Sequence, residues 1–222
     1  MEVGVLVPAR NEARSLSRVL GGLRAALPGA RVLVVDGHSE DDTVAVALAF
    51  GAEVLRQPGR GYADALAEGY RALAGWPIQA ALQLDADGQH PPEAAPGLLA
   101  ALADGDVVFG SRQGTGIGGA RLRRAGSALL SASVALGTGR WLHDVMSGFW
   151  ACSPRAVAVF AERLPRDVAD ANARVIALRA GLGVLERPVI MAPRLEGESM
   201  HAGWGGLRNG ARSLGAVWRA AR

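Results

Sequence analysis

The chain has 222 residues, a formal net charge of +3 and a composition that is half apolar, which excludes an intrinsically disordered chain. No apolar stretch reaches the roughly 20 residues of a membrane-spanning helix, and no basic run interleaved with aromatic residues favours nucleic acid. All 24 basic residues are arginine, which binds phosphate well through its planar fork. Nothing at the N-terminus resembles a signal peptide, and the lone Cys152 cannot form an internal disulfide, so we expect a cytoplasmic protein.

The first half of the chain alternates short apolar runs with helical patterns. Strands are predicted at Val3–Val7, Val32–Val35, Glu53–Leu55, Ala80–Leu84 and Asp106–Phe109. Helices are predicted at Leu16–Leu27, Thr43–Phe50, Tyr62–Ala74 and Pro92–Leu102. This α/β pattern predicts a mainly parallel sheet with helices on both faces, and ligands of such sheets bind beyond the carboxyl ends of the strands.

The second half is less regular. Helices are predicted at about Arg121–Leu136, Pro154–Glu162 and Val168–Ala180, followed by a strand at Val184–Ile190. A glycine- and tryptophan-containing stretch, Gly137–Trp150, separates the first two of these helices. No boundary splits off a second domain, so we expect one domain over residues 1–202.

Polar motifs follow the first two predicted strands. The first strand ends in Val7-Pro8-Ala9-Arg10-Asn11-Glu12, and the second runs into Asp36-Gly37-His38-Ser39-Glu40-Asp41-Asp42-Thr43. An acid at a strand end, such as Asp36, can accept hydrogen bonds from a ribose or a base. Ser39–Thr43 equally fits a turn followed by a helix cap, and the motif alone does not separate the two interpretations.

The fourth strand delivers the strongest chemical signal, Asp85-Ala86-Asp87-Gly88-Gln89-His90. Residues i and i+2 of an extended segment point to the same side, so Asp85 and Asp87 can face one cation together. Two neighbouring carboxylates repel each other, and Mg²⁺ or Mn²⁺ would neutralise them while keeping positions open for phosphate oxygens. The alternative is a solvated acidic loop. His90 is either an additional ligand or a turn residue before Pro91-Pro92.

In their order and spacing these motifs resemble glycosyltransferase family 2, in particular its dolichol-phosphate (polyprenol-phosphate) mannosyltransferase-like group. The motifs that carry the resemblance are the two turns above, Gly59-Arg60-Gly61, Asp85–Pro91, Gly110-Ser111-Arg112, Ser147-Gly148-Phe149 and Arg194…Gly197-Glu198-Ser199. The resemblance implies a GT-A fold, a nucleoside-diphosphate-sugar donor such as GDP-mannose or UDP-glucose, a divalent metal, Mg²⁺ or Mn²⁺, and inversion by a single displacement. A polyprenyl-phosphate acceptor is the choice that the arginines discussed below favour, and no nucleic-acid partner is expected from the sequence.

The resemblance assigns roles to residues by position. The nucleotide-sugar-binding set is Pro8, Ala9, Arg10, Glu12, Asp36, Gly61, Asp85 and Arg124. The metal and diphosphate set is Asp85, Asp87 and Gln89, and the catalytic set is Asp87, Arg112, Arg194 and Asp170. Two departures stand out, because Gly37 and His38 occupy a turn that often has two acids, and Met200 occupies a position that is frequently basic.

The acceptor decides between two kinds of chemistry. A phosphate monoester is mostly ionised at neutral pH, so it needs arginines more than a general base. A hydroxyl acceptor needs a base, usually a carboxylate. The arginines Arg121, Arg123, Arg124 and Arg194 favour phosphate, unless they form a solvated helix face. Asp144, Asp167 and Asp170 keep a soluble or glycan hydroxyl acceptor open, although the last two also fit a helix start. A third hypothesis is a non-catalytic nucleotide-sugar-binding module.

The residue pattern of the C-terminal segment 203–222 predicts an amphipathic helix. At about 100° per residue, Leu207, Leu214 and Trp218 share one stripe, with Arg208, Arg212 and Arg219 beside it. This pattern is typical of an interfacial helix that would hold the enzyme on the cytoplasmic membrane face. The alternative is a helix that packs on the domain through the same stripe.

Overall fold

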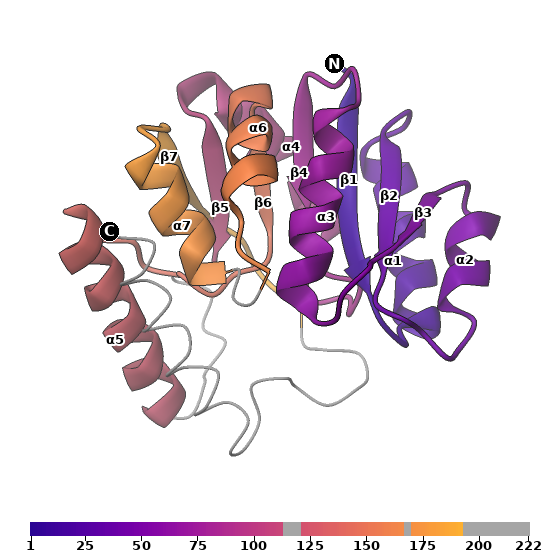
Figure 1. Ribbon diagram of the computed structural model, residues 1–222, viewed down its shortest axis with the longest axis horizontal. Coiled ribbons are helices and arrows are strands. Elements are labelled where there is room, and N and C mark those ends of the chain that lie inside the picture. Colours follow the sequence, from indigo (N-terminus) through magenta and orange to yellow (C-terminus); the bar gives the residue numbers. More distant parts are fainter. Residues whose placement is uncertain (113–120, 167–169, 193–222) are drawn as a thin grey trace.

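The computed structural model of the chain describes residues 1–112, 121–166 and 170–192, with side chains throughout these ranges except at 121–127 and 170. Within these ranges, seven strands form one sheet in the order β3-β2-β1-β4-β6-β5-β7 (Figure 1). The strands are β1 Val3–Ala9, β2 Arg31–Asp36, β3 Glu53–Arg56, β4 Ala80–Gln83, β5 Val107–Ser111, β6 Trp150–Cys152 and β7 Val184–Pro188. β6 is antiparallel to β4 and β5, and the other pairs are parallel.

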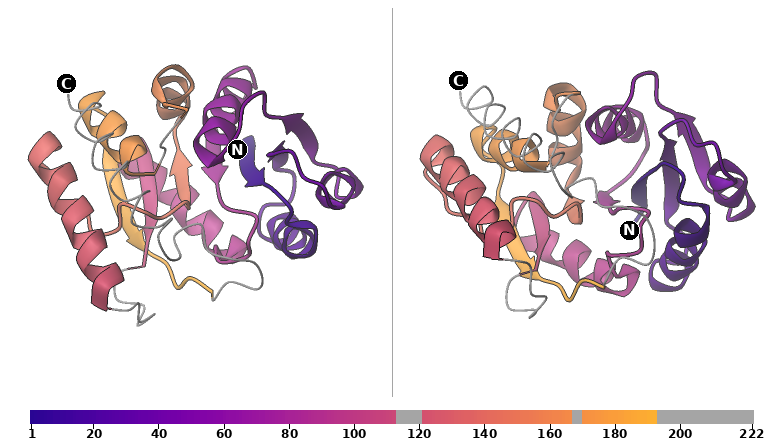
Figure 2. Two further views of the ribbon diagram at one scale, coloured as in Figure 1. Left: turned by 60° about the horizontal axis from the view of Figure 1, so that its bottom comes forward. Right: turned by 90° about the horizontal axis from the view of Figure 1, so that it is seen from below.

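Helices cover both faces of the sheet (Figures 1 and 2). One face carries α1 Ala13–Ala26, α2 Thr43–Ala49 and α4 Ala95–Ala100, the last flanked by 3₁₀ turns at Pro92–Ala94 and Ala101–Asp104. The other carries α3 Tyr62–Ala74, α6 Pro154–Arg163 and α7 Asp170–Arg179, with α5 Arg121–Thr138 beside α7. No helix in the described ranges is long and apolar enough to span a lipid bilayer.

The parallel strands are apolar along their whole length because both of their faces are buried. In β1, all seven residues are buried, and alternate side chains enter opposite cores. Leu6 packs on the α3 side together with Leu66 and Tyr70, whereas Val5 and Val7 pack on the α1 side. Packing on both faces therefore fixes where each strand ends along the sheet, and with it the position of the loops that carry polar residues.

The sequence prediction of a mainly parallel α/β sheet is confirmed, with strand ends displaced by one or two residues. β5 begins one residue later than predicted and continues to Ser111, and β7 ends at Pro188. β6, at Trp150–Cys152, was not predicted. A three-residue strand is too short to give a periodic signal, and its place between β4 and β5 depends on pairing between distant parts of the chain.

Candidate active site

The loops that follow β1 and β2 are joined at the carboxyl edge of the sheet. Ala9 pairs with Asp36 in register, and the Gly37 amide donates to the Ala9 carbonyl over 2.8 Å. The Asn11 amide donates to Ser39 Oγ over 3.0 Å, and Asn11 Oδ1 accepts from the Glu40 amide over 2.8 Å. Asn11 has a φ of 53°, a left-handed conformation that asparagine tolerates better than most residues. The two predicted nucleotide-binding loops thus form one surface.

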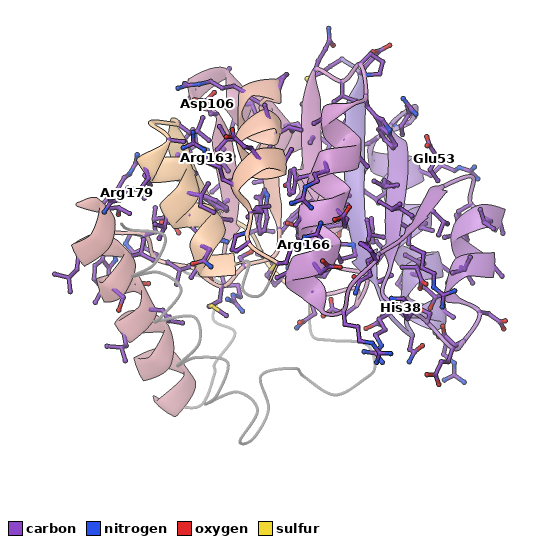
Figure 3. All side chains as sticks on the ribbon, viewed as in Figure 1. His38, Glu53, Asp106, Arg163, Arg166 and Arg179 are labelled. Atoms are coloured by element: carbon purple, nitrogen blue, oxygen red, sulfur yellow. The ribbon has the colours of Figure 1, made fainter. Side chains whose placement is uncertain are left out.

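Asp36 lies buried at the end of β2 beside a histidine and an arginine. Its Oδ1 accepts from the Ser39 amide over 3.1 Å, and its Oδ2 is 4.0 Å from Arg56 Nε. Arg56 Nε also donates to His38 Nδ1 over 3.2 Å, while His38 Nε2 is 3.0 Å from the Gly59 carbonyl oxygen. Because Nδ1 accepts, the geometry assigns the imidazole proton to Nε2. Figure 3 shows His38 at this edge of the sheet.

The remaining residues predicted for the nucleotide differ in how they are presented. Pro8 and Ala9 are buried in β1, whereas the Arg10 side chain is exposed. The Glu12 amide donates to Thr43 Oγ1 over 2.9 Å, and Glu12 Oε2 accepts from Ser15 Oγ over 2.6 Å. Neither α1 nor α2 has a side-chain hydrogen bond from its N-cap residue, so these contacts join the two loops rather than cap a helix. The Arg10 side chain stays exposed.

The acidic loop follows β4 immediately. Asp85 Oδ1 accepts from the Tyr62 hydroxyl over 2.9 Å, and the Asp85 side chain is 28% exposed. Asp87 is almost buried, and its Oδ1 accepts from the Gln89 amide over 3.0 Å. Gly88, between Asp87 and Gln89, has a φ of 77°, which glycine adopts without strain. Both predicted carboxylates therefore lie in one tight turn at the end of an apolar strand.

The His90 ring holds this turn through a contact with its backbone. Its buried ring stacks on Phe149, with centroids 5.3 Å apart and an interplanar angle of 14°, and its Nδ1 accepts from the Asp85 amide over 3.0 Å. Burial lowers the pKa of His90 to about 4, although the negative charge of Asp87 acts in the opposite direction. A neutral, buried ring with Nδ1 used by the backbone favours a structural role for His90 over the predicted role as an additional ligand.

The donor atoms at this turn fit a hard divalent cation. Asp85, Asp87 and Gln89 offer only oxygen ligands from their carboxylate and carboxamide groups, as Mg²⁺ and Mn²⁺ prefer. In the part of the chain that the structure describes, no three His, Cys, Asp or Glu side chains gather into a metal-binding group. One or two carboxylates completed by substrate phosphates and waters is the usual arrangement for Mg²⁺, so an incomplete protein cage is consistent with this site.

A second charged group lies where β5 ends. Arg112 Nε and Nη2 donate to the two oxygens of Asp144 over 2.7 and 2.6 Å, and the Arg112 amide donates to Asp144 Oδ2 over 3.0 Å. Burial would raise the pKa of Asp144, but the hydrogen bonds and charge of Arg112 outweigh it, so this pKa is lowered. A carboxylate held in this way is a weaker base than a free one, which favours an orienting role for Asp144 over the activation of a hydroxyl.

The loop that carries Asp144 is held from two sides. From β7, Glu186 Oε1 accepts from the Asp144 amide over 2.9 Å. From α7, the fully buried Arg174 donates through Nη2 to the carbonyls of Asp144 and Ser147 over 3.2 and 2.8 Å. The Arg174 guanidinium also lies 3.9 Å from the centre of the Phe109 ring. The loop then passes Asp85 so closely that a Cβ at Gly148 would lie 2.6 Å from Asp85 Oδ2.

Gly61 is the N-cap residue that precedes α3, and a polar contact ties this region to the second half of the chain. Gly61 has a φ of 95°, which favours glycine. Asp64 Oδ2 accepts from the Gly59 amide over 2.9 Å, and its Oδ1 accepts from Arg166 Nη1 over 2.6 Å. Arg166 also pairs with Glu68. Figure 3 shows Arg166 beside α3.

Some predicted residues lie outside the described residues. Arg194, Asp167 and the segment 203–222 are among them. Arg124 and Asp170 belong to α5 and α7, but their side chains, like those of Arg121 and Arg123, are outside the description. Their roles stay predictions.

Sequence reasoning missed several residues of the site. The set comprises Arg56, Tyr62, Gln83, Arg174 and Glu186, which contact the predicted residues from neighbouring elements. Arg56 and Gln83 carried a usable signal, because they end the third and fourth strands at the same edge as Asp36. The other three lie in helices or in a strand, where their residue types are common.

The mainly parallel sheet with its helices on both faces has the GT-A fold, which solved structures share. Glucosyl-3-phosphoglycerate synthase from Mycobacterium tuberculosis with phosphoglyceric acid aligns with a TM-score of 0.75 at 19% identity, covering 99% of this chain and 80% of that chain. The same enzyme with Mn²⁺, uridine diphosphate and phosphoglyceric acid aligns with a TM-score of 0.74 at 18% identity, covering 99% and 78%. The predicted GT-A fold is confirmed.

The chain belongs to glycosyl transferase family 2, whose sequence profile matches residues 4–159. An uncharacterized glycosyltransferase of Mycobacterium tuberculosis is 33% identical over 98% of this chain and 96% of its own length. Polyprenol monophosphomannose synthase of Mycolicibacterium smegmatis is 28% identical over 90% of this chain and 80% of its own. Undecaprenyl-phosphate mannosyltransferase of Micrococcus luteus is 38% identical over 51% and 49%. The family predicted from the motifs is confirmed, and the chain is a glycosyltransferase.

Proposed function

We propose that this glycosyltransferase moves a hexose, mannose or glucose, from a nucleoside-diphosphate sugar to a polyprenyl phosphate, with Mg²⁺ or Mn²⁺ and with inversion. The observation that carries the proposal is the pairing of two charged groups at one edge of the sheet: the acidic turn of Asp85 and Asp87, and the Arg112–Asp144 pair. Gly148 lies next to the first group, in the loop that also carries Asp144.

The donor half of the proposal follows from the loops after β1, β2 and β4. Asp36 and the exposed Arg10 would bind the nucleoside and its phosphates, while Asp85, Asp87 and Gln89 would hold the cation. When bound, the cation would neutralise the negative charge that grows on the leaving diphosphate. The proposed donor is GDP-mannose or UDP-glucose. Mannosyltransferase relatives favour the first, and a neighbouring structure bound to uridine-diphosphate-glucose favours the second.

The acceptor half rests on arginine. Asp144, in the loop that leads into β6, is committed to Arg112 and has a lowered pKa. An ionised phosphate needs positive charge to hold it rather than a base to deprotonate it. Arg112, which is 47% exposed, supplies that charge, and Arg124 and Arg194 would add to it. Relatives named for undecaprenyl-phosphate and polyprenol substrates support this choice.

A hydroxyl acceptor is the second candidate, favoured by one observation. Two structural neighbours are complexes of a glucosyl-3-phosphoglycerate synthase with phosphoglyceric acid, which is a soluble molecule. Transfer to such an acceptor would need a carboxylate base, for which Asp170 is the proposed residue. A polyprenyl phosphate, by contrast, implies contact with a membrane surface, for which the segment 203–222 is the proposed element.

One partition experiment separates these acceptors. The purified protein is incubated with GDP-mannose or UDP-glucose labelled in the sugar, with Mn²⁺, and with either undecaprenyl phosphate or 3-phosphoglycerate. We expect label in the organic phase with the lipid and no labelled product with 3-phosphoglycerate. Labelled product from 3-phosphoglycerate alone would replace the polyprenyl-phosphate proposal with the hydroxyl one.

A further inference from the structure

We propose that Tyr62 is a positioning residue for the divalent cation, because its hydroxyl fixes the carboxylate of Asp85. This inference rests on the proposed metal-dependent function. Tyr62 is the first residue of α3, and Asp85 follows β4, so the contact joins a helix start to a strand end. The Tyr62 hydroxyl donates to Asp85 Oδ1 over 2.9 Å.

The direction of this hydrogen bond is set by Gln83, the last residue of β4. The Gln83 Nε2 amide donates to the Gly148 carbonyl over 2.6 Å and to the Tyr62 hydroxyl oxygen over 3.0 Å. A backbone carbonyl can only accept, so the contact with Gly148 fixes which end of the Gln83 carboxamide faces Tyr62. The Tyr62 oxygen therefore accepts from Gln83, and its single proton points to Asp85.

Packing leaves this group little freedom to rearrange. The Gln83 side chain is fully buried, and its Nε2 has both protons engaged by the two contacts above. A Cβ at Gly148 would lie 2.7 Å from the Tyr62 hydroxyl and 2.6 Å from Asp85 Oδ2, so the backbone of the loop already touches both side chains. The carboxylate is thus held from the Tyr62 side and confined from the Gly148 side.

A carboxylate oriented before the cation arrives binds it more tightly, because less conformational freedom is lost on binding. Loss of a hydrogen-bond partner behind a metal ligand typically weakens metal binding by about 10- to 100-fold. Tyr62 would therefore act on the cation through Asp85, without touching it.

The test measures Mn²⁺ affinity directly. Free Mn²⁺ is followed by electron paramagnetic resonance while Mn²⁺ is titrated into wild type and Tyr62→Phe, each with GDP or UDP present. Tyr62→Phe keeps the ring and removes only the hydroxyl, so we expect the Mn²⁺ dissociation constant to rise by about 10- to 100-fold. Gln83→Met keeps the Tyr62 hydroxyl but frees its orientation, so a smaller rise is expected.

The chain offers a matched control in its other tyrosine. The Tyr70 hydroxyl is buried, accepts from Trp150 Nε1 over 2.6 Å and lies 3.6 Å from Cys152 Sγ. Tyr70→Phe removes the same group about two helical turns along α3 from Tyr62, where its hydroxyl contacts Trp150 and Cys152 and not Asp85. Thermal stability should therefore fall while Mn²⁺ affinity stays at the wild-type value. An equal loss of affinity in both variants would mean that stability, rather than Asp85, is responsible, and would overturn the inference.

Two further outcomes separate this inference from the function on which it rests. Wild type that binds no Mn²⁺ with either nucleotide would overturn the metal-dependent function itself. Wild type that binds Mn²⁺, with Tyr62→Phe binding it equally well, would overturn only the role of Tyr62.

Discussion

Arg112 and Asp144 are joined by three hydrogen bonds, two from the guanidinium and one from the Arg112 backbone amide. The residues are 32 positions apart in the chain, and the pair connects the end of β5 to the loop that leads into β6. Asp144 is nearly buried, while Arg112 is 47% exposed, so the pair presents its positive member outward. An aspartate that orients an exposed arginine in this way suits a site that grips an anion.

Replacing Arg112 by lysine tests this geometry while keeping the charge. Lysine cannot make the parallel pair of hydrogen bonds that Arg112 makes from Nε and Nη2, so the orientation of the side-chain charge at this position would no longer be fixed. Because a hydrogen bond to a charged group contributes about 1.5–3 kcal/mol, we expect kcat/KM for sugar transfer to fall by about ten- to a hundredfold. The melting temperature should change little, because Arg112 is half exposed.

A control arginine lies at the opposite edge of the sheet. Arg155 pairs with Asp106 over 3.2 Å and is more exposed than Arg112, and Figure 3 shows Asp106 far from the His38 edge. Arg155→Lys should transfer sugar at the wild-type rate. Equal kinetics for Arg112→Lys and wild type would show that the forked geometry of Arg112 has no part in the reaction.

The buried Arg174 should matter for the stability of the protein. Its hydrogen bonds to the carbonyls of Asp144 and Ser147 hold the loop that carries the partner of Arg112. Arg174→Met removes them, and we expect the free energy of unfolding in urea to fall by about 2–4 kcal/mol. Arg179, an exposed arginine on the same helix that donates to the Gly137 carbonyl, is the control, and Arg179→Met should cost less than about 0.5 kcal/mol. Similar losses for the two variants would contradict the role assigned to Arg174.

Gly148 should not tolerate even one methyl group. The added Cβ would lie 2.6 Å from Asp85 Oδ2 and 2.7 Å from the Tyr62 hydroxyl, so Gly148→Ala must displace the acidic turn or the loop. Overpacking of this kind costs about 1–3 kcal/mol, and transfer activity should fall by more than about tenfold if even 1.4 kcal/mol of it is lost from the transition state. Gly97→Ala in α4, where nothing lies within 4 Å of the added Cβ, is the neutral comparison. Unchanged activity of Gly148→Ala would mean that sugar transfer does not depend on the close packing of Gly148 against Asp85 and Tyr62.

The parts of this fold that could be predicted from sequence are those governed by local pattern. Apolar runs such as β1 and β2 signal buried parallel strands, and the positions of Asp36 and Asp85 at the carboxyl edge were predictable because both lie at or just after strand ends. The helix predicted at Pro92–Leu102 proved to be a short α-helix, Ala95–Ala100, between two 3₁₀ turns. A helical segment was correctly predicted there, but not its division into one α-helix and two 3₁₀ turns.

The residues that support the site could not be predicted, because their roles depend on contacts between distant segments. Tyr62 lies 23 positions from Asp85, and Gln83 lies 65 positions from the Gly148 carbonyl. Arg174 looks like an exposed helix arginine in the sequence, yet it is buried beneath the loop at Ser147. For each of them, the packing of the sheet and helices decides the partner, and residue type alone carries no such information.

The central claim is that Asp85 and Asp87 hold a divalent cation on which sugar transfer depends. The most direct measurement is transfer from the labelled donor by wild type and Asp87→Ala, in Mn²⁺, in Mg²⁺ and in excess chelator, with melting temperatures recorded for both proteins. We expect chelator to abolish wild-type transfer and added metal to restore it. Asp87→Ala should remain folded and lose at least about a hundredfold, because such a cation contributes several kcal/mol of transition-state stabilisation. Full activity of the wild type in excess chelator would contradict the account.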